Sequence, residues 1–167
     1  DMIIIDNLSN KFPKKQDVIK LLCDRHKGIG SDGLILLDGS FENNIIMSFY
    51  NSDGSEASMC GNGGRCFVSY IYSKYCLSDI VFKAGDGFHR AYVDYKGGRS
   101  YDVRLSMNDV TSVIRDNNSF VLNTGVPHYV RFVDNLDSES FIDDSRKIRY
   151  SNRFMPEGIN VDFAKYE

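Results

Sequence analysis

Several features that would assign this protein to a common class are missing from its 167 residues. No apolar run approaches the ~20 residues that a membrane-spanning helix needs. Lysine and arginine form no basic stripe and the formal net charge is -3, so neither nucleic acid nor an anionic membrane surface is an expected partner. The four cysteines lack the Cys-x-x-Cys pairing of zinc sites and the regular spacing of a disulfide framework. We therefore expect free thiols, no bound metal and a reducing, cytoplasmic environment.

The sequence does contain enough apolar residues for a core, because 42% of the residues are hydrophobic, including 11 Phe and 10 Tyr. Most of them lie in short segments typical of strands. In residues 101–107, apolar and polar residues alternate, and this period of two indicates one buried sheet face. The polar residues 108–118 predict a linker. The expected strands are 2–6, 34–37, 45–50, 79–84, 88–95, 100–107, 119–123, 129–133 and 159–164.

Two segments have the periodicity of helices, but they differ in kind. In residues 16–27 the apolar side chains recur at helical spacing on one side, which predicts a surface helix. In residues 65–76 apolar side chains cover almost the whole circumference, which predicts a buried helix. One buried helix among several strands predicts an α+β fold, in which a mixed β-sheet curls as a barrel around a central helix.

The buried helix follows the sequence Cys-Gly-Asn-Gly-Gly at residues 60–64, which places Cys60 at its N-terminus. The first backbone N–H groups of a helix lack internal partners, and the helix dipole adds partial positive charge there, so both favour a thiolate. Glycines let these N–H groups approach an anion closely. A carboxylate bound there would hold its α-carbon beside Cys60, which suits proton transfer at that carbon. The alternative is an ordinary buried cysteine at a glycine-rich turn.

A second glycine-rich segment, Gly28 to Gly33, matches the Gly-x-Gly-x-x-Gly pattern of dinucleotide-binding proteins. That fingerprint follows a strand and opens a helix. Here it follows the helix expected at 16–27 and opens the strand expected at 34–37, so the order is reversed. We therefore expect these glycines to shape a turn, and we expect no nucleotide cofactor.

Four segments resemble diaminopimelate epimerases, in the same order along the chain: DRHKGIGSDGLILL (24–37), DGSEASMCGNGGRC (53–66), NTGVPHYV (123–130) and PEGINVDF (156–163). The resemblance implies a cofactor-free isomerase that interconverts LL- and meso-2,6-diaminopimelate, for lysine and peptidoglycan synthesis. It also implies two similar domains, each a barrel around a central helix. We expect an N-terminal domain at 1–115 and the start of a second domain, incomplete here, at 116–167.

The resemblance also implies roles for individual residues. Cys60 resembles one of two cysteines that transfer the α-proton. The backbone N–H groups of Gly61 and Asn62 would bind the reacting carboxylate. The side chains of Asn51 and Asn160 would help to hold the distal amino-acid end of the substrate. Without the resemblance, the asparagines would be interpreted as turn or cap residues.

His128 resembles a residue that modulates the acidity of the catalytic thiols. Taken alone, it would be interpreted as a hydrogen-bonded loop histidine. His26 and His89 are interpreted as structural or surface residues. The expected partner is thus a small-molecule amino-acid substrate, and a homodimer is compatible with the resemblance.

The sequence departs from the family pattern in several places. Val126 stands where the family usually has Asn before the Pro-His pair, and Gly33 stands where some members have a ligand-contacting Gln. A substrate-binding Asn of the family would immediately precede Asp1. The second catalytic motif, Cys-Gly-(Thr/Ser)-Gly, does not occur in these residues.

No other cysteine of this chain is a suitable second base. Inversion needs an acid and a base on opposite faces of one carbon, and Cys66 lies six residues along the same expected helix, about 9 Å from Cys60 at ~1.5 Å per residue. Cys76 is further along, and Cys23 belongs to a different helix. We therefore expect the second cysteine beyond Glu167, and we expect residues 1–167 alone to be inactive.

Three other functions are compatible with the sequence. Related proline or hydroxyproline racemases would use similar cysteine motifs. A cysteine hydrolase would use Cys60 as nucleophile and His128 as base. A non-enzymatic binding or redox-sensing module would use a reactive Cys60 without catalysing a reaction.

Overall fold

The computed structural model describes residues 1–98 and 100–166, which form two compact units, Asp1–Asn108 and Asp109–Glu167. The division lies within the segment that we expected to be a linker, and it comes earlier than the expected domain boundary after residue 115. The reason is strand β8 (Val113–Asp116), which pairs with a strand of the second unit. The supposed linker is therefore partly a strand.

The first unit is built on a seven-stranded sheet with the order β1-β2-β3-β5-β6-β7, and β4 pairs with β3 beside this path. The pairs β1–β2 and β3–β5 are parallel and the other pairs are antiparallel, so the sheet is mixed, as predicted. The strands are β1 (Met2–Asp6), β2 (Gly33–Gly39), β3 (Ile45–Asn51), β4 (Glu56–Ala57), β5 (Asp79–Ala84), β6 (Gly87–Gly97) and β7 (Ser100–Leu105).

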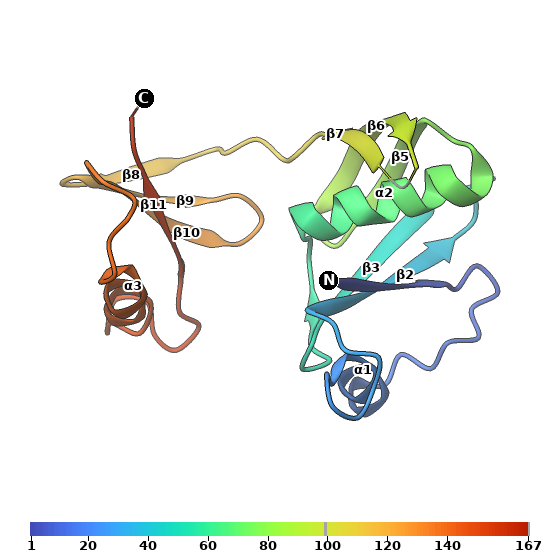
Figure 1. Ribbon diagram of the computed structural model, residues 1–167, viewed down its shortest axis with the longest axis horizontal. Helices are drawn as coiled ribbons and strands as arrows, with labels where there is room; N and C mark the ends of the chain where they lie inside the picture. The colour runs from blue at the N-terminus through green and yellow to red at the C-terminus, as the bar shows by residue number, and fades with distance from the viewer. Residues whose placement is uncertain (99, 167) are drawn as a thin grey trace. The chain divides into compact units, whose positions relative to one another are not determined.

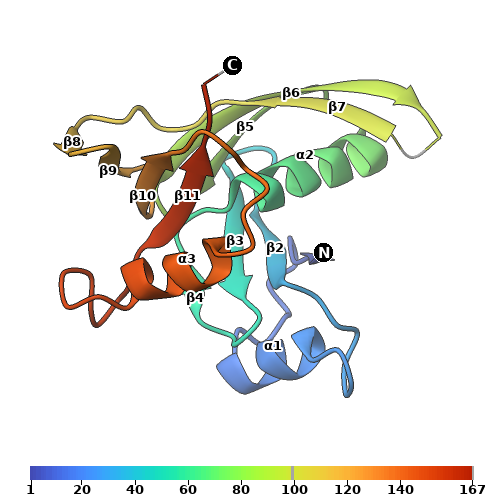
Figure 2. The ribbon, with the colours of Figure 1, turned by 60° about the vertical axis from the view of Figure 1, so that its left-hand side comes forward.

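This sheet curls around helix α2 (Gly61–Tyr75). The helix contacts β1, β2 and β3 as well as β6 and β7. Figure 1 and Figure 2 show it between the strands β2–β3 on one side and β5–β7 on the other. Phe67, Val68 and Ile71 are completely buried. A helix that is apolar nearly all round needs partners on several sides, and the curl of the sheet provides them. The predicted α+β fold with a sheet curled around a central helix is confirmed.

Helix α1 (Gln16–Cys23) covers the opposite face of β2. Ile19 packs there with Leu34, whereas Ile35, the next residue of the strand, belongs to the core around α2. Strand β2 is therefore covered on both faces, which explains its continuous apolar sequence.

The turn after α1 is tighter than the sequence predicts. The helix ends at Cys23, whereas the sequence predicted that it would continue to residue 27. Asp24 has a non-helical backbone (φ −65°, ψ 123°), and its carboxylate accepts hydrogen bonds from the backbone N–H groups of His26 and Lys27. Leu22 O then accepts hydrogen bonds from the backbone N–H groups of residues 29 and 30, at 3.0 and 3.1 Å. Gly30 has φ +84°, and a Cβ at Gly28 would lie 2.0 Å from Leu21 O. These glycines shape a turn, as predicted.

A buried polar cluster joins β2 to β3 and to the connection between β1 and α1. The carboxylate of Asp38 accepts hydrogen bonds from Asn7 Nδ2 at 2.6 Å, Ser48 Oγ at 2.6 Å and Lys14 Nζ at 2.8 Å. Burial acts to raise the pKa of Asp38, but the hydrogen bonds from Lys14, Ser48 and Asn7 outweigh it, so the pKa lies below its ordinary value. The ionised carboxylate therefore stabilises this part of the fold.

The second unit has a four-stranded sheet with the order β11-β10-β9-β8. Strands β8 to β10 are antiparallel, and β10 pairs in parallel with β11 through a crossover that contains helix α3 (Phe141–Arg149). The helix, which we did not predict, contacts β11, where Phe141 stacks on Phe163 with 4.2 Å between ring centroids. The other strands are β9 (Ser119–Asn123), β10 (Pro127–Phe132) and β11 (Asn160–Ala164). None of the helices within residues 1–98 and 100–166 is long and apolar enough to cross a membrane.

Candidate active site

Cys60 is the N-cap residue of α2, as the sequence predicts. Its backbone is extended (φ −140°, ψ 117°), and its Sγ accepts a hydrogen bond from the backbone N–H of Gly63 at 3.3 Å. Its carbonyl accepts the first hydrogen bond of the helix, from the N–H of Gly64 at 2.7 Å. The sulfur thus takes the place that a Ser or Thr oxygen usually has at an N-cap. A backbone N–H and the positive end of the helix dipole are thus both directed at the sulfur.

The next two residues leave their backbone N–H groups available. In the part of the chain that the structure describes, the N–H groups of Gly61 and Asn62 donate to no acceptor. A Cβ added at Gly61 would make only an ordinary contact with the side chain of Met107, at 4.0 Å, so it would fit without a clash. The side-chain oxygen of Asn62 accepts a hydrogen bond from Arg65. Asn62 can therefore offer a ligand its backbone N–H, and the two N–H groups together suit a carboxylate.

The glycines of this segment serve different purposes. A Cβ at Gly64 would lie 2.8 Å from Leu105 Cδ2, and one at Gly63 would lie 3.2 Å from Ile35 Cδ1. These two glycines let the first turn of α2 approach the sheet. Gly61, in contrast, has no such neighbour, so packing does not explain its lack of a side chain.

The other three cysteines are not placed to face Cys60 across a single substrate carbon. Cys66 is exposed and belongs to α2 itself, and Cys76 is the C-cap of the same helix. Cys23 is buried in the cluster on the other face of the sheet, where its sulfur accepts a hydrogen bond from Ser31 Oγ at 3.3 Å. All four cysteines are free.

Asn51 ends β3, at the turn into β4. Its backbone N–H donates to Ser55 O at 2.8 Å, its Nδ2 donates to Ser55 Oγ at 3.1 Å, and its carbonyl accepts from the N–H of Gly54 at 2.9 Å. Asn51 thus closes a turn, as expected of an asparagine without reference to any family. Its side chain is exposed, and this structural role does not exclude contact with a ligand.

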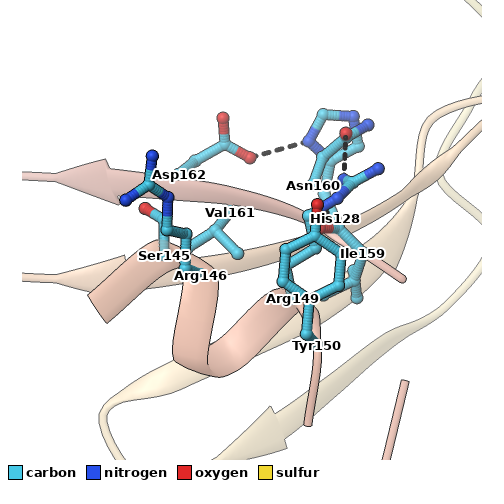
Figure 3. A pocket seen from close by; sticks show the side chains of 9 residues that line it. All are labelled: His128, Ser145, Arg146, Arg149, Tyr150, Ile159, Asn160, Val161 and Asp162. Carbon is cyan, nitrogen blue, oxygen red and sulfur yellow. Dashed lines mark hydrogen bonds and ion pairs between the residues drawn. The ribbon is translucent and has the colours of Figure 1, made fainter. Parts of the chain in front are cut away.

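His128 and Asn160 line one pocket of about 350 Å³ in the second unit (Figure 3). They lie opposite each other on the parallel strands β10 and β11. His128 Nδ1 is 2.7 Å from Asp162 Oδ2. Asn160 Oδ1 accepts a hydrogen bond from Arg149 Nη1 at 3.3 Å. Because a guanidinium only donates, this contact orients the amide so that its Nδ2 is left for a ligand.

The other two histidines are a structural and a surface residue, as predicted. His89 is buried, and its ring nitrogens lie 3.0 Å from Ser106 O and 2.9 Å from Asp86 Oδ1. His26 is exposed in the turn after α1. Among the described residues, no group of three or more His, Cys, Asp or Glu side chains is placed to hold a metal ion.

Comparison with known proteins identifies the family. The family model described as diaminopimelate epimerase matches residues 1–112. The chain belongs to the diaminopimelate epimerase family. The diaminopimelate epimerase of Flavobacterium psychrophilum is 41% identical over 98% of this chain, and that of Aquifex aeolicus is 35% identical over 99%. The chain spans 63% and 65% of the lengths of these two relatives.

Solved structures share the fold at low sequence identity. A probable proline racemase from Agrobacterium radiobacter K84 superposes with a TM-score of 0.58 at 13% identity, over 85% of this chain and 50% of that one. A phenazine biosynthesis protein of the PhzF family from Bacillus anthracis superposes with a TM-score of 0.57 at 13% identity, over 80% of this chain and 50% of that one. At this identity the likeness shows the fold alone.

Two departures from the pattern of the diaminopimelate epimerase family have structural consequences. At Gly33, a Cβ would lie 2.7 Å from both Phe49 Cε2 and Tyr50 O, so this chain has no room for the Gln that some members place there. Val126 belongs to the turn between β9 and β10, where its carbonyl accepts a hydrogen bond from the N–H of Thr124 at 3.2 Å. Its exposed apolar side chain cannot form the hydrogen bonds that an Asn would.

Sequence reasoning missed Asp162 and Arg149, which orient His128 and Asn160. For Asp162 a signal existed, because residues two apart on a strand share a face and Asn160 and Asp162 have that spacing. For Arg149 the signal was the charge pattern of α3, with acids in its first turn and bases in its last.

Proposed function

We propose that this chain supplies one half of the catalytic machinery of a cofactor-independent diaminopimelate epimerase, in which Cys60 transfers the α-proton as LL- and meso-2,6-diaminopimelate interconvert. The observation that carries the proposal is the position of Cys60 at the N-cap of α2, directly before two available N–H groups. Family membership supports the choice of diaminopimelate as substrate.

The N-terminus of α2 suits the chemistry of α-proton removal. The N–H groups of Gly61 and Asn62 bind the carboxylate attached to the reacting carbon. When the thiolate of Cys60 takes the α-proton, the electron pair of the C–H bond delocalises into that carboxylate, and the same N–H groups stabilise the added charge. A thiol on the opposite face then gives a proton to the carbon, which inverts it. The positions of Cys23, Cys66 and Cys76 favour a second thiol outside residues 1–167.

The remaining site residues have supporting roles in this proposal. Asn51 and Asn160 hold the distal amino-acid end of the substrate, and the orientation of the Asn160 amide supports its use as a donor to a carboxylate. His128 modulates the acidity of the catalytic thiols.

The proposal is tested with the full-length protein and a matched pair of variants, Cys60→Ser and Cys66→Ser. Both cysteines belong to the region of α2, and Ser is a good N-cap residue, so Cys60→Ser should keep the fold. Incubated with LL-diaminopimelate in deuterated water, the wild type and Cys66→Ser should incorporate α-deuterium with inversion. Cys60→Ser should be slower by about a hundredfold or more, because a positioned acid or base contributes that much. Full activity of a folded Cys60→Ser would reject the role of Cys60.

The same assay, repeated with other substrates, separates the alternatives. A proline or hydroxyproline racemase would exchange the α-proton of proline or hydroxyproline and not that of diaminopimelate. A cysteine hydrolase would cleave an ester or amide substrate without α-exchange. Residues 1–167 alone should not invert the substrate, and inversion by them would place both bases within this chain.

A further inference from the structure

Two neighbouring strands bring His128 and Asp162 together, although 34 residues separate them in the sequence. In the parallel pair β10–β11, His128 lies opposite Asn160 and Val130 lies opposite Asp162. Side chains two residues apart on a strand share a face, so His128 and Asp162 lie on a diagonal of one face. Their Nδ1 and Oδ2 atoms are 2.7 Å apart, which is a hydrogen-bond distance (Figure 3).

This contact decides which nitrogen of the ring bears the proton. An ionised carboxylate only accepts hydrogen bonds, so Nδ1 is the donor and, in the neutral ring, Nε2 holds the lone pair. We propose that Asp162 is a positioning residue for His128, which holds the ring in the Nδ1–H tautomer and presents Nε2 as a proton acceptor.

The charges around the pocket explain why a carboxylate is useful there. Arg146 and Arg149 also line the pocket and carry positive charge. Among the described residues that line it, Asp162 is the one acidic residue. Its carboxylate holds the ring of His128 by a hydrogen bond at Nδ1 and leaves Nε2 free to accept a proton. This role of Asp162 rests on the proposed function of His128 in modulating the acidity of the thiols.

The tautomer can be measured without any assay of activity. The full-length protein is prepared with isotope-labelled histidine, and the ring signals of His128 are assigned by their loss in His128→Gln. In the wild type, the nitrogen shifts should show a protonated Nδ1. In Asp162→Ala the neutral ring should change to the Nε2–H form that free imidazole side chains prefer. Asp162→Asn keeps an acceptor oxygen and should restore part of the Nδ1–H population.

Glu139→Gln is the matched control. Glu139 is an exposed carboxylate just before α3, and it is not among the described residues that line the pocket of His128, so the variant removes the same charge from the same unit without touching that pocket. Its histidine signals and its activity should equal those of the wild type.

Kinetics give the second readout. In Asp162→Ala, kcat should fall about tenfold, a part of the ~100-fold or more that a positioned proton-transfer group contributes, because His128 stays but loses its orientation, while KM changes by less than about twofold. An unchanged tautomer in Asp162→Ala would overturn the proposal, and so would an equal loss of kcat in Glu139→Gln or an Asp162→Asn variant no better than Asp162→Ala. If the full-length protein does not epimerise diaminopimelate, the proposed function fails, and the tautomer measurement still decides the role of Asp162.

Discussion

Replacing Gly61 with Pro or with Ala tests whether the backbone at the start of α2 binds the substrate. Both substitutions add a Cβ, but only Pro removes the N–H. Gly61 is the first residue of the helix, where Pro is well tolerated. The residue before a Pro must be extended, and Cys60 already is, with φ −140° and ψ 117°. The added Cβ would meet only Met107, at 4.0 Å. Both variants should therefore fold, with unfolding free energies within about 1 kcal/mol of the wild type.

The expected difference in activity follows from the lost hydrogen bond. A hydrogen bond to a charged group that is removed from water contributes roughly 1.5–3 kcal/mol. Gly61→Pro should therefore lower kcat/KM by roughly 10- to 150-fold relative to Gly61→Ala, which keeps the donor.

The assay measures initial rates of the full-length protein with LL-diaminopimelate, and thermal melts control for folding. If Gly61→Ala is as slow as Gly61→Pro while both melt like the wild type, the backbone N–H does not bind the carboxylate. The argument from the N-terminus of α2 would then be wrong.

Two further substitutions test the packing and the electrostatics of the first unit. Gly33→Ala would place a Cβ 2.7 Å from the backbone oxygen of Tyr50, which cannot move without disturbing the pairing of β2 with β3, and this overpacking should cost about 1–3 kcal/mol. Urea unfolding should show this loss of stability, and a Gly33→Ala variant as stable as the wild type would contradict the close approach. The second substitution is Asp38→Asn. Because the pKa of the Asp38 carboxyl is lower in the folded protein than its ordinary value of 3.8, the ionised carboxylate stabilises the fold fully above pH 3.8. This stabilisation is lost as the pH falls through the pKa of the folded protein. The difference in unfolding free energy between the wild type and Asp38→Asn should therefore shrink on acidification below pH ~4, and a difference that does not change with pH would refute this role.

The elements with a clear local pattern were predicted correctly. Strand β5 alternates between exposed and buried residues along its whole length, and the buried half of β6 does the same, because one face of the curled sheet is covered. Helix α2 was recognised from its apolar circumference. These patterns depend on neighbours in the chain, so they are visible in the sequence.

The elements of the second unit were harder to predict. Helix α3 is polar on most of its surface and contains no buried residue, so it lacks the apolar stripe that marks most helices. Strand β8 is exposed over most of its length, and only its pairing with β9 defines it as a strand. Such elements are stabilised by contacts with neighbouring strands more than by the intrinsic helix or strand preference of their own residues.

The sequence by itself determined the position of Cys60 at the start of a buried helix, because capping and the helix dipole involve only adjacent residues. It also placed His128 and Asn160 in segments that resemble the diaminopimelate epimerase family. Only the tertiary structure showed that a side chain at Gly61 would touch nothing more closely than Met107, at 4.0 Å, while one at Gly64 would clash with Leu105. It alone paired His128 with Asp162. These contacts join residues far apart in the chain, and their geometry depends on strand register and on the curl of the sheet, which no local pattern specifies.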